Sequence, residues 1–219
     1  MRIRSVLLGT AFLLTTATGA AAQGASSPTA FVGGLGGLTF GTETSGAIAG
    51  QVGVRISRDL FVIGEIGRMW DVTPSEVSDE IETGVEFLEQ QGIPVNLEFS
   101  VPAFYGFGGI RWAQSGRRVN PFVEGGVGFA RLTGEVSGTI GGVNVDDFLE
   151  EFDSELGDFS SNEVLIAFGG GANIRLTPTV SLDAGYRFTH IFIDDPVAVD
   201  EPTVNTSMVY AAVKILFGR

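Results

Sequence analysis

The sequence predicts an all-β fold, an eight-stranded antiparallel up-and-down transmembrane β-barrel. Eight segments rich in apolar and small residues each reach the roughly 9–11 residues that a tilted strand needs to cross a bilayer. The connections between them alternate in length, which is typical of barrels in the bacterial outer membrane. Downstream of residue 22 the chain lacks the run of about 18–20 apolar residues that a membrane-spanning helix requires.

The first 22 residues have the composition of an export signal. Arg2 and Arg4 form a positively charged start, residues 6–18 are apolar, and alanines at 20–22 offer a cleavage site. We expect residues 1–22 to form a cleaved signal peptide and residues 23–219 to form a single barrel domain. The chain contains no cysteine, which excludes disulfide bonds, cysteine catalysis and a thiol-linked lipid anchor.

The predicted strands span residues 29–40, 47–57, 60–72, 97–112, 121–133, 164–176, 180–193 and 206–217. Their number is even, as in bacterial single-chain barrels, and closure removes sheet edges whose unpaired backbone groups are costly in lipid. The connections at 57–59, 113–120 and 177–179 are short, whereas those at 73–96, 134–163 and 194–205 are long. With both termini in the periplasm, the short connections face the periplasm and the long ones face outward.

Alternation with a period of two supports these strands. In the last strand Val209, Val213 and Ile215 share one face, whereas Tyr210 and Lys214 share the other. We expect the apolar face to contact lipid and the polar face to line the lumen, while the glycine-rich first and fourth strands leave their facing open. Helical spacing predicts short amphipathic helices at 75–91 and 146–156, with loops ordered only by packing on the rim as the alternative.

Three stretches form a pattern of strand, tight Thr-Pro turn and strand: residues 121–130 (PFVEGGVGFA), 168–178 (FGGGANIRLTP) and 182–188 (LDAGYRF). This pattern resembles the small outer-membrane β-barrel superfamily of the OmpA-transmembrane and opacity-protein type. The resemblance implies a barrel in the outer membrane of Gram-negative bacteria and no particular function. Two features depart from the family: the terminal aromatic residue, Phe217, is followed by Gly218 and Arg219, and we expect no peptidoglycan-binding domain after the last strand.

Charged residues on the inward faces are the candidate site. By alternation they are Arg55, Glu65, Arg111, Glu124, Arg175, Asp183, Arg187 and Lys214. The interior of an eight-stranded barrel is just wide enough for side chains, and buried ions need partners. We therefore expect the three acids to pair with some of the five bases in a structural network that closes the lumen. At least one of the remaining bases would bond to backbone, to polar groups such as Gln51 and Asn173, or to water at the end of the barrel. A gated path for small ions is the alternative.

The other candidates favour a structural role. His190, the only histidine, has no neighbouring serine, so the His–Ser arrangement of lipid A deacylases is not indicated. The glycine runs match no nucleotide-binding spacing. Trp70 and Trp112, at opposite ends of adjacent strands, predict an aromatic girdle at the membrane surfaces. We expect no catalytic residues, no cofactor and no metal centre.

The chain carries 26 acidic and 13 basic residues, and most of the acids fall in the long connections. This charge disfavours nucleic acid as a partner, whereas carboxylates in the loops suit divalent cations or cation bridges to lipopolysaccharide phosphates. We expect a monomer in contact with outer-membrane lipid and lipopolysaccharide.

The predicted function is non-enzymatic: envelope structure, or surface interaction through the acidic loops. Its alternatives are a narrow porin-like ion channel, a lipid-modifying barrel enzyme, and a secreted soluble calyx of lipocalin type, which would need an apolar lumen.

Overall fold

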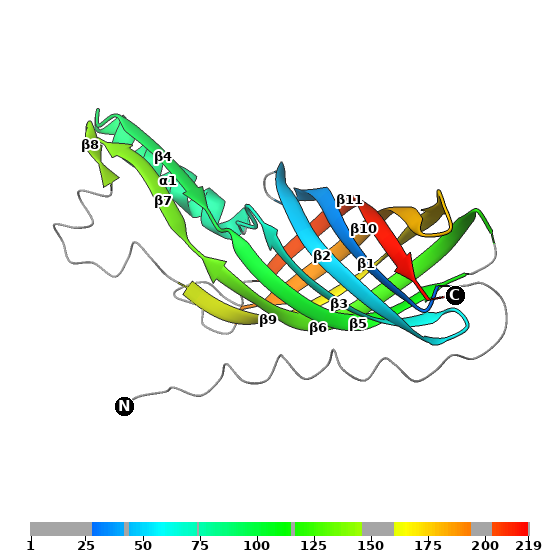
Figure 1. Cartoon of the computed structure of the whole chain (residues 1–219). Helices are drawn as coiled ribbons and strands as arrows, with labels where there is room; N and C mark the ends of the chain where they lie inside the picture. Colours follow the sequence, from blue (N-terminus) through cyan, green and yellow to red (C-terminus); the bar gives the residue numbers. More distant parts are fainter. Residues whose placement is uncertain are drawn as a thin grey trace.

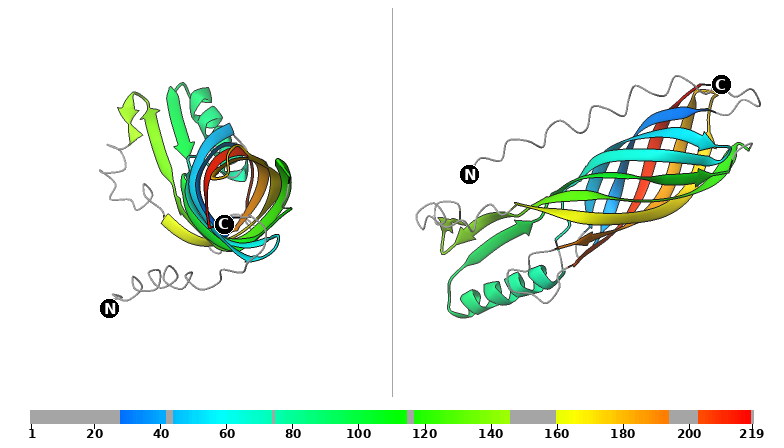
Figure 2. Two further views of the ribbon diagram at one scale, coloured as in Figure 1. Left: turned by 45° about the vertical axis from the view of Figure 1, so that its right-hand side comes forward. Right: turned by 90° about the horizontal axis from the view of Figure 1, so that it is seen from below.

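In the computed structural model, eight strands close into an antiparallel barrel (Figures 1 and 2). The structure describes residues 28–41, 44–73, 75–114, 117–145, 160–193 and 203–218. The barrel strands are β1 (Ala30–Phe40), β2 (Thr44–Ser57), β3 (Leu60–Met69), β5 (Ala103–Ala113), β6 (Val119–Thr133), β9 (Ser160–Arg175), β10 (Val180–Phe192) and β11 (Thr203–Phe217). Each pairs with its sequence neighbours in the barrel, and β1 pairs with β11 to close it. The predicted fold class is confirmed.

The two ends of the barrel differ. The connections β2–β3, β5–β6 and β9–β10, together with residues 28 and 218, lie at one end, which we call the turn end. The opposite end, which carries the longer connections, we call the loop end. At the β9–β10 turn the Thr177 hydroxyl accepts hydrogen bonds from the backbone N–H of Thr179 and of Val180, at 3.2 and 2.9 Å. A side chain therefore satisfies the backbone groups that this tight reversal leaves unpaired.

The faces of the strands follow the predicted alternation. In β11, Val209, Val213 and Ile215 are exposed on the outside, whereas Tyr210 and Lys214 are buried inside. The structure also gives the facing of the glycine-rich strands. In β1 Phe31 and Leu35 point inward, with Val32 and Leu38 outward. In β5 Tyr105 and Phe107 point inward. The exposed apolar belt on the outside is the surface that lipid covers in a membrane barrel.

The prediction of one strand over residues 97–112 is wrong. The structure breaks it at Val101 and Pro102, giving β5 and a separate strand, β4 (Val95–Ser100). Strand β4 pairs with β7 (Glu135–Ile140), and β7 pairs with β8 (Val143–Asn144), in a second, three-stranded sheet. Pro102 has no N–H to donate, and its carbonyl accepts from Thr133, so the chain bends there without losing a backbone bond.

This second sheet projects beyond the loop end, because β4 continues into β5 and β7 continues from β6 (Figure 1). Helix α1 (Ser75–Gln90) lies against β4, so the helix predicted at 75–91 is confirmed and the alternative of an irregular loop is wrong there. The third predicted strand ends at Met69 instead of residue 72. Beyond it, Val72 donates to the carbonyl of Val101 at 3.0 Å, which joins the extension to the barrel rim.

Two predicted segments, the signal peptide at 1–22 and the helix at 146–156, lie outside the described residues. Within the described part of the chain, no helix has the length and apolar character to cross a membrane. Trp70 and Trp112 are each 45% exposed at opposite ends of the paired strands β3 and β5, as the aromatic girdle requires.

Inward glycines let the wall coil tightly. A Cβ built on Gly128 of β6 would lie 2.1 Å from the carbonyl oxygen of Gly106 on β5, so a side chain there would collide with the neighbouring backbone. Gly126 has the same constraint, at 2.4 Å from the oxygen of Gly108. Because glycine has no side chain, the sheet can curve strongly at these positions while bulky side chains from other positions fill the lumen.

Candidate functional site: the charged lumen

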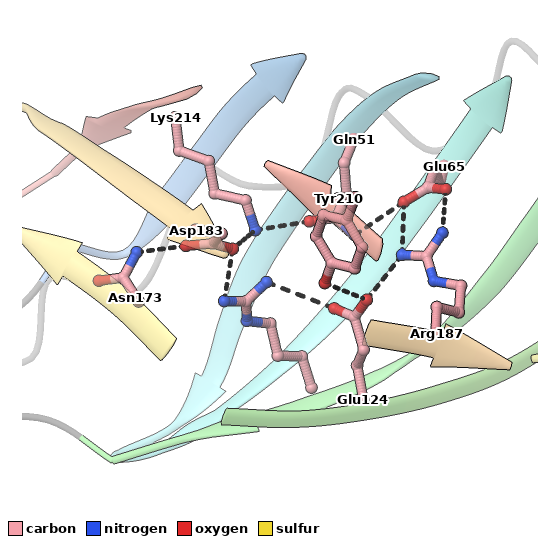
Figure 3. Close-up of polar contacts among 9 residues, drawn as sticks. Gln51, Glu65, Glu124, Asn173, Asp183, Arg187, Tyr210 and Lys214 are labelled. Carbon is pink, nitrogen blue, oxygen red and sulfur yellow. Dashed lines mark hydrogen bonds and ion pairs between the residues drawn. The ribbon is translucent and has the colours of Figure 1, made fainter. Parts of the chain in front are cut away.

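Six charged side chains meet in the middle of the barrel, and each is nearly or wholly inaccessible to solvent. They come from five of the eight barrel strands: Glu65 from β3, Arg111 from β5, Glu124 from β6, Asp183 and Arg187 from β10, and Lys214 from β11. Figure 3 labels Glu65, Glu124, Asp183, Arg187 and Lys214 and shows that these side chains point toward one another from different strands. Alternation alone placed all six on inward faces, and the register of the closed sheet brings them together.

Arg187 joins two of the acids. Its Nη1 donates to Glu65 Oε1, and its Nη2 donates to Glu65 Oε2 at 2.9 Å and to Glu124 Oε1 at 2.6 Å. Two phenol groups also donate hydrogen bonds to these carboxylates: the Tyr105 hydroxyl donates to Glu65 at 2.8 Å, and the Tyr210 hydroxyl donates to Glu124 at 3.1 Å. The guanidinium therefore has anionic partners along both edges, as a buried arginine needs.

Asp183 is the third acid, and two bases share it. Arg111 Nη2 lies 2.6 Å from Asp183 Oδ2, and Lys214 Nζ lies 2.7 Å from the same oxygen. The amide nitrogen of Asn173 donates to Asp183 Oδ1 at 2.6 Å. Arg111 also reaches Glu124, with 3.3 Å between Nη1 and Oε2, and so connects this half of the cluster with the first.

Gln51 of β2 closes the cluster into a ring. Its amide oxygen accepts from Lys214 Nζ at 2.6 Å, and its amide nitrogen donates to Glu65 Oε2 at 2.9 Å. The chain of contacts thus runs Glu65–Arg187–Glu124–Arg111–Asp183–Lys214–Gln51 and back to Glu65 (Figure 3). We call these seven residues the lumen ring.

The lumen ring is electrically balanced, with three carboxylates against two guanidinium groups and one ammonium group. Burying it is tolerable because every charge has an opposite partner and the carboxylates also accept from amide or phenol groups. Aromatic side chains pack on the cations: the Arg111 guanidinium lies 3.5 Å from the centre of the Phe122 ring, and that of Arg187 lies 4.9 Å from the centre of the Phe107 ring. The lumen is therefore charged at its centre, in contrast to the apolar interior of a calyx.

The other two predicted lumen residues, Arg55 and Arg175, lie outside the ring. Both are near the turn end, where β2 and β9 finish. Arg55 Nη1 donates to the backbone carbonyl of Arg58 at 2.8 Å, so this base bonds to backbone, and its guanidinium lies 4.9 Å from the centre of the Phe61 ring. Sequence reasoning named Gln51 and Asn173 as partners of the spare bases: Gln51 does accept from Lys214, whereas Asn173 donates to the acid Asp183. It missed the roles of Tyr105 and Tyr210, although both share the inward parity of the charges.

Two further polar residues can be compared with the sequence analysis: His190, a candidate there, and Glu163, which fell within the connection over residues 134–163. His190 Nδ1 lies 2.7 Å from Oδ1 of Asn205; strand pairing places Asn205 and Ile166 opposite this histidine, not a serine. Glu163, assigned to the third long connection, lies instead inside β9 and is 3% exposed, because this strand begins at Ser160, before the predicted start at 164. The described residues include no group of three His, Cys, Asp or Glu side chains able to hold a metal ion.

The fold matches solved outer-membrane proteins, and the sequence matches a family model. Neisserial surface protein A aligns at 15% identity over 86% of this chain and 96% of its own, with a TM-score of 0.51. The N-terminal β-barrel domain of Pseudomonas aeruginosa OprF aligns at 11% identity over 87% of this chain and 98% of its own, with a TM-score of 0.52.

A major outer membrane protein of Thermus thermophilus aligns at 11% identity over 86% of this chain and 99% of its own, also with a TM-score of 0.52. At these identities the likeness is one of fold. No curated protein sequence is significantly similar to the chain. The family model described as "Outer membrane protein beta-barrel domain" matches residues 8–217. The chain therefore belongs to this family of β-barrel proteins of the bacterial outer membrane.

Proposed function

We propose that this protein is a non-enzymatic outer-membrane barrel that contributes to envelope structure and to surface interaction through its acidic outer segments. The observation that carries the proposal is the combination of a lumen crossed by the buried ring with a sheet and a helix that project beyond one end. The ring supports a structural role for the lumen, and the projection supports a role for the outer surface.

The ring argues against conduction. An ion passing the centre would have to separate pairs such as Arg187–Glu124, whose atoms are 2.6 Å apart and shielded from water. Breaking buried pairs costs several kcal/mol, which makes a permanently open path unfavourable. Planar-bilayer recording tests this point: we expect no steady conductance from the wild type. Reproducible conductance that changes in Arg187→Gln or Glu124→Gln would favour the porin-like alternative.

The geometry around His190 argues against lipid modification by a His–Ser pair, because its ring nitrogen is engaged by Asn205 and not by a nucleophile. Mass profiling of lipid A from cells with and without the protein tests this alternative. We expect identical profiles. A lost acyl chain that reappears in His190→Ala would show that the barrel is an enzyme.

We propose that the turn end faces the periplasm and the loop end faces outward. Among the described residues, the turn end carries Arg55, Arg58, Arg117, Arg118 and Arg175 against the single acid Asp59. At the loop end, α1 alone carries six acids and no base. The natural chain has no cysteine, so single cysteines report topology cleanly. A membrane-impermeant maleimide should label Glu86→Cys on α1 in intact cells but leave Arg117→Cys unlabelled until the cells are opened. The reverse pattern would invert the orientation.

Lipopolysaccharide is the proposed lipid partner of the loop end. Arg68 on β3, Phe104 on β5 and Arg131 on β6 occupy one row of the sheet and all face outward. The two arginines are the outward-facing bases of this part of the described strands, and neighbouring strands are about 4.8 Å apart, so their backbones are about 10 Å apart. A charge on the lipid face costs least beside the headgroups, where phosphate can pair with guanidinium.

Lipopolysaccharide titrated into nanodiscs that contain the barrel tests this assignment. The double variant Arg68→Gln/Arg131→Gln should bind it more weakly than the wild type. Arg117→Gln/Arg118→Gln, which removes the same charge at the turn end, should bind it normally. Equal binding by both variants would refute the contact.

Divalent cations at the acidic segments are a second proposed partner. We further propose a monomer without affinity for nucleic acid.

A further inference from the structure

We propose that the turn end of the lumen is a binding site for a small soluble oxyanion, a phosphate or carboxylate group, held by Arg55 and Arg175. The inference is independent of the function proposed above. It concerns a cavity that lies between the lumen ring and the turn end. Inward residues near the ends of the barrel strands, on the side of the turn end, line this cavity.

The charge of this cavity is one-sided. Arg55, Arg111, Arg175 and Lys214 all line it, and none of the described residues that line it is acidic. The acid near Arg55 is Asp59, which lies outside the lining. Arg111 and Lys214 belong to the ring, where they share Asp183. Arg55 and Arg175 lie outside the ring and add two further positive charges to the wall. Adjacent cations in a partly enclosed space repel each other, and an anion between them relieves that repulsion.

Unused donors point to the same conclusion. The Nε atoms of Arg55 and Arg175 are both buried, and neither has a hydrogen-bond partner in the described part of the chain. Buried polar groups in native proteins are almost always satisfied by protein, water or a ligand, so two unpaired donors on residues that line one cavity favour an acceptor beside them. A guanidinium group binds oxyanions through paired N–H groups, which suits these residues to the task.

The site is also held in place. Arg55 is fixed by its bond to the Arg58 carbonyl at 2.8 Å and by the Phe61 ring against its guanidinium. At the other end of the cavity, Asn173 donates to Asp183 of the ring, so its amide is oriented as well. A cation fixed in advance loses little entropy on binding, which favours recognition of an ion over random counter-ion attraction.

Size restricts the ligand. The cavity leaves about 50 Å³ to solvent, enough for a few water molecules or one small anion but too little for a nucleotide or a sugar phosphate. The lumen ring bounds it on one side, so a ligand enters from the turn end. The barrel wall separates it from lipid, which favours a soluble anion over a phospholipid headgroup although both offer the same phosphate chemistry.

The test is a titration of the full mature protein with sodium phosphate at constant ionic strength, in nanodiscs of phosphatidylcholine, followed by calorimetry. We expect saturable binding, weakened at least tenfold in Arg175→Gln and in Arg55→Gln. Arg118→Gln is the matched control: it removes one charge from the same end but from an exposed side chain outside the cavity, and its affinity should change less than twofold.

Thermal unfolding gives a second readout that does not depend on the heat of binding. A ligand that binds only the folded barrel raises the unfolding midpoint, so phosphate should raise it in the wild type and in Arg118→Gln but not in Arg175→Gln. Heat-modifiable migration on gels checks that each variant folds.

Three results would overturn the proposal. The first is no saturable binding by the wild type, which would mean that water alone fills the cavity. The second is an equal loss in Arg118→Gln, which would reduce the effect to general charge. The third is loss of phosphate binding when phosphatidylglycerol replaces phosphatidylcholine, which would make a lipid headgroup the occupant.

Discussion

Replacing Glu124 with alanine should destabilise the barrel by about 3–5 kcal/mol, the usual cost of removing one member of a buried ion pair. The carboxylate accepts from Arg187 at 2.6 Å, from Tyr210 at 3.1 Å and from Arg111 at 3.3 Å, and its side chain is 1% exposed. Each lost bond to a charged group is worth about 1.5–3 kcal/mol. Arg187 keeps Glu65 and Arg111 keeps Asp183, so the total stays below the sum of three full losses.

Urea unfolding of the purified barrel in detergent, followed by tryptophan fluorescence, measures this loss. With a denaturant slope of about 1–3 kcal/mol per molar, the midpoint should fall by about 1 M or more. Glu86→Ala, on the exposed face of α1, should change the free energy of unfolding by no more than about 0.5 kcal/mol. Glu124→Gln keeps the shape without the charge and should fall between the two. Equal midpoints for Glu124→Ala and Glu86→Ala would show that Glu124 is solvated and would refute the buried ring.

Two further predictions concern the close packing of glycines between barrel strands and the tyrosine hydrogen bond to Glu65. Gly128→Ala should lower the free energy of unfolding by about 1–3 kcal/mol, because the added Cβ would lie 2.1 Å from the Gly106 carbonyl oxygen. Gly50→Ala, whose Cβ would have no atom within 4 Å, should be near neutral in the same urea assay. Equal effects of the two substitutions would contradict the tight coiling of the barrel wall. Tyr105→Phe removes one donor, at 2.8 Å from Glu65, and should lower the free energy of unfolding by about 1–2 kcal/mol, less than Glu124→Ala; no change in midpoint would mean that water replaces the hydroxyl.

Period-two alternation predicted the barrel and the inward charges well, because lipid outside and a packed lumen inside impose opposite polarity on successive residues. It could not predict which charges meet. The pairing of Arg187 with Glu65, 122 residues apart, depends on the register of all the strands between them, and local pattern carries no information on that register.

The loop end was the least predictable part. Residues 97–112 were predicted as one strand, although residues 95–100 and 103–113 belong to different sheets. The one local signal of the break was Pro102, which cannot donate a ladder hydrogen bond. Glu163 was placed in the connection over residues 134–163 because the next strand was predicted to begin at 164, yet β9 begins at Ser160 and includes it.

The continuity of β6 into β7, and of β4 into β5, has a mechanical consequence. A pull on the projecting sheet is transmitted along β6, which lies between its antiparallel neighbours β5 and β9 (Figure 2). The hydrogen bonds of these strand pairs are then loaded in shear, and many must yield together instead of one after another. Arg111 and Glu124, opposite each other on β5 and β6, cross-link the two strands that bear most of this load. The protein is thus built to resist force applied to the sheet that projects from its loop end.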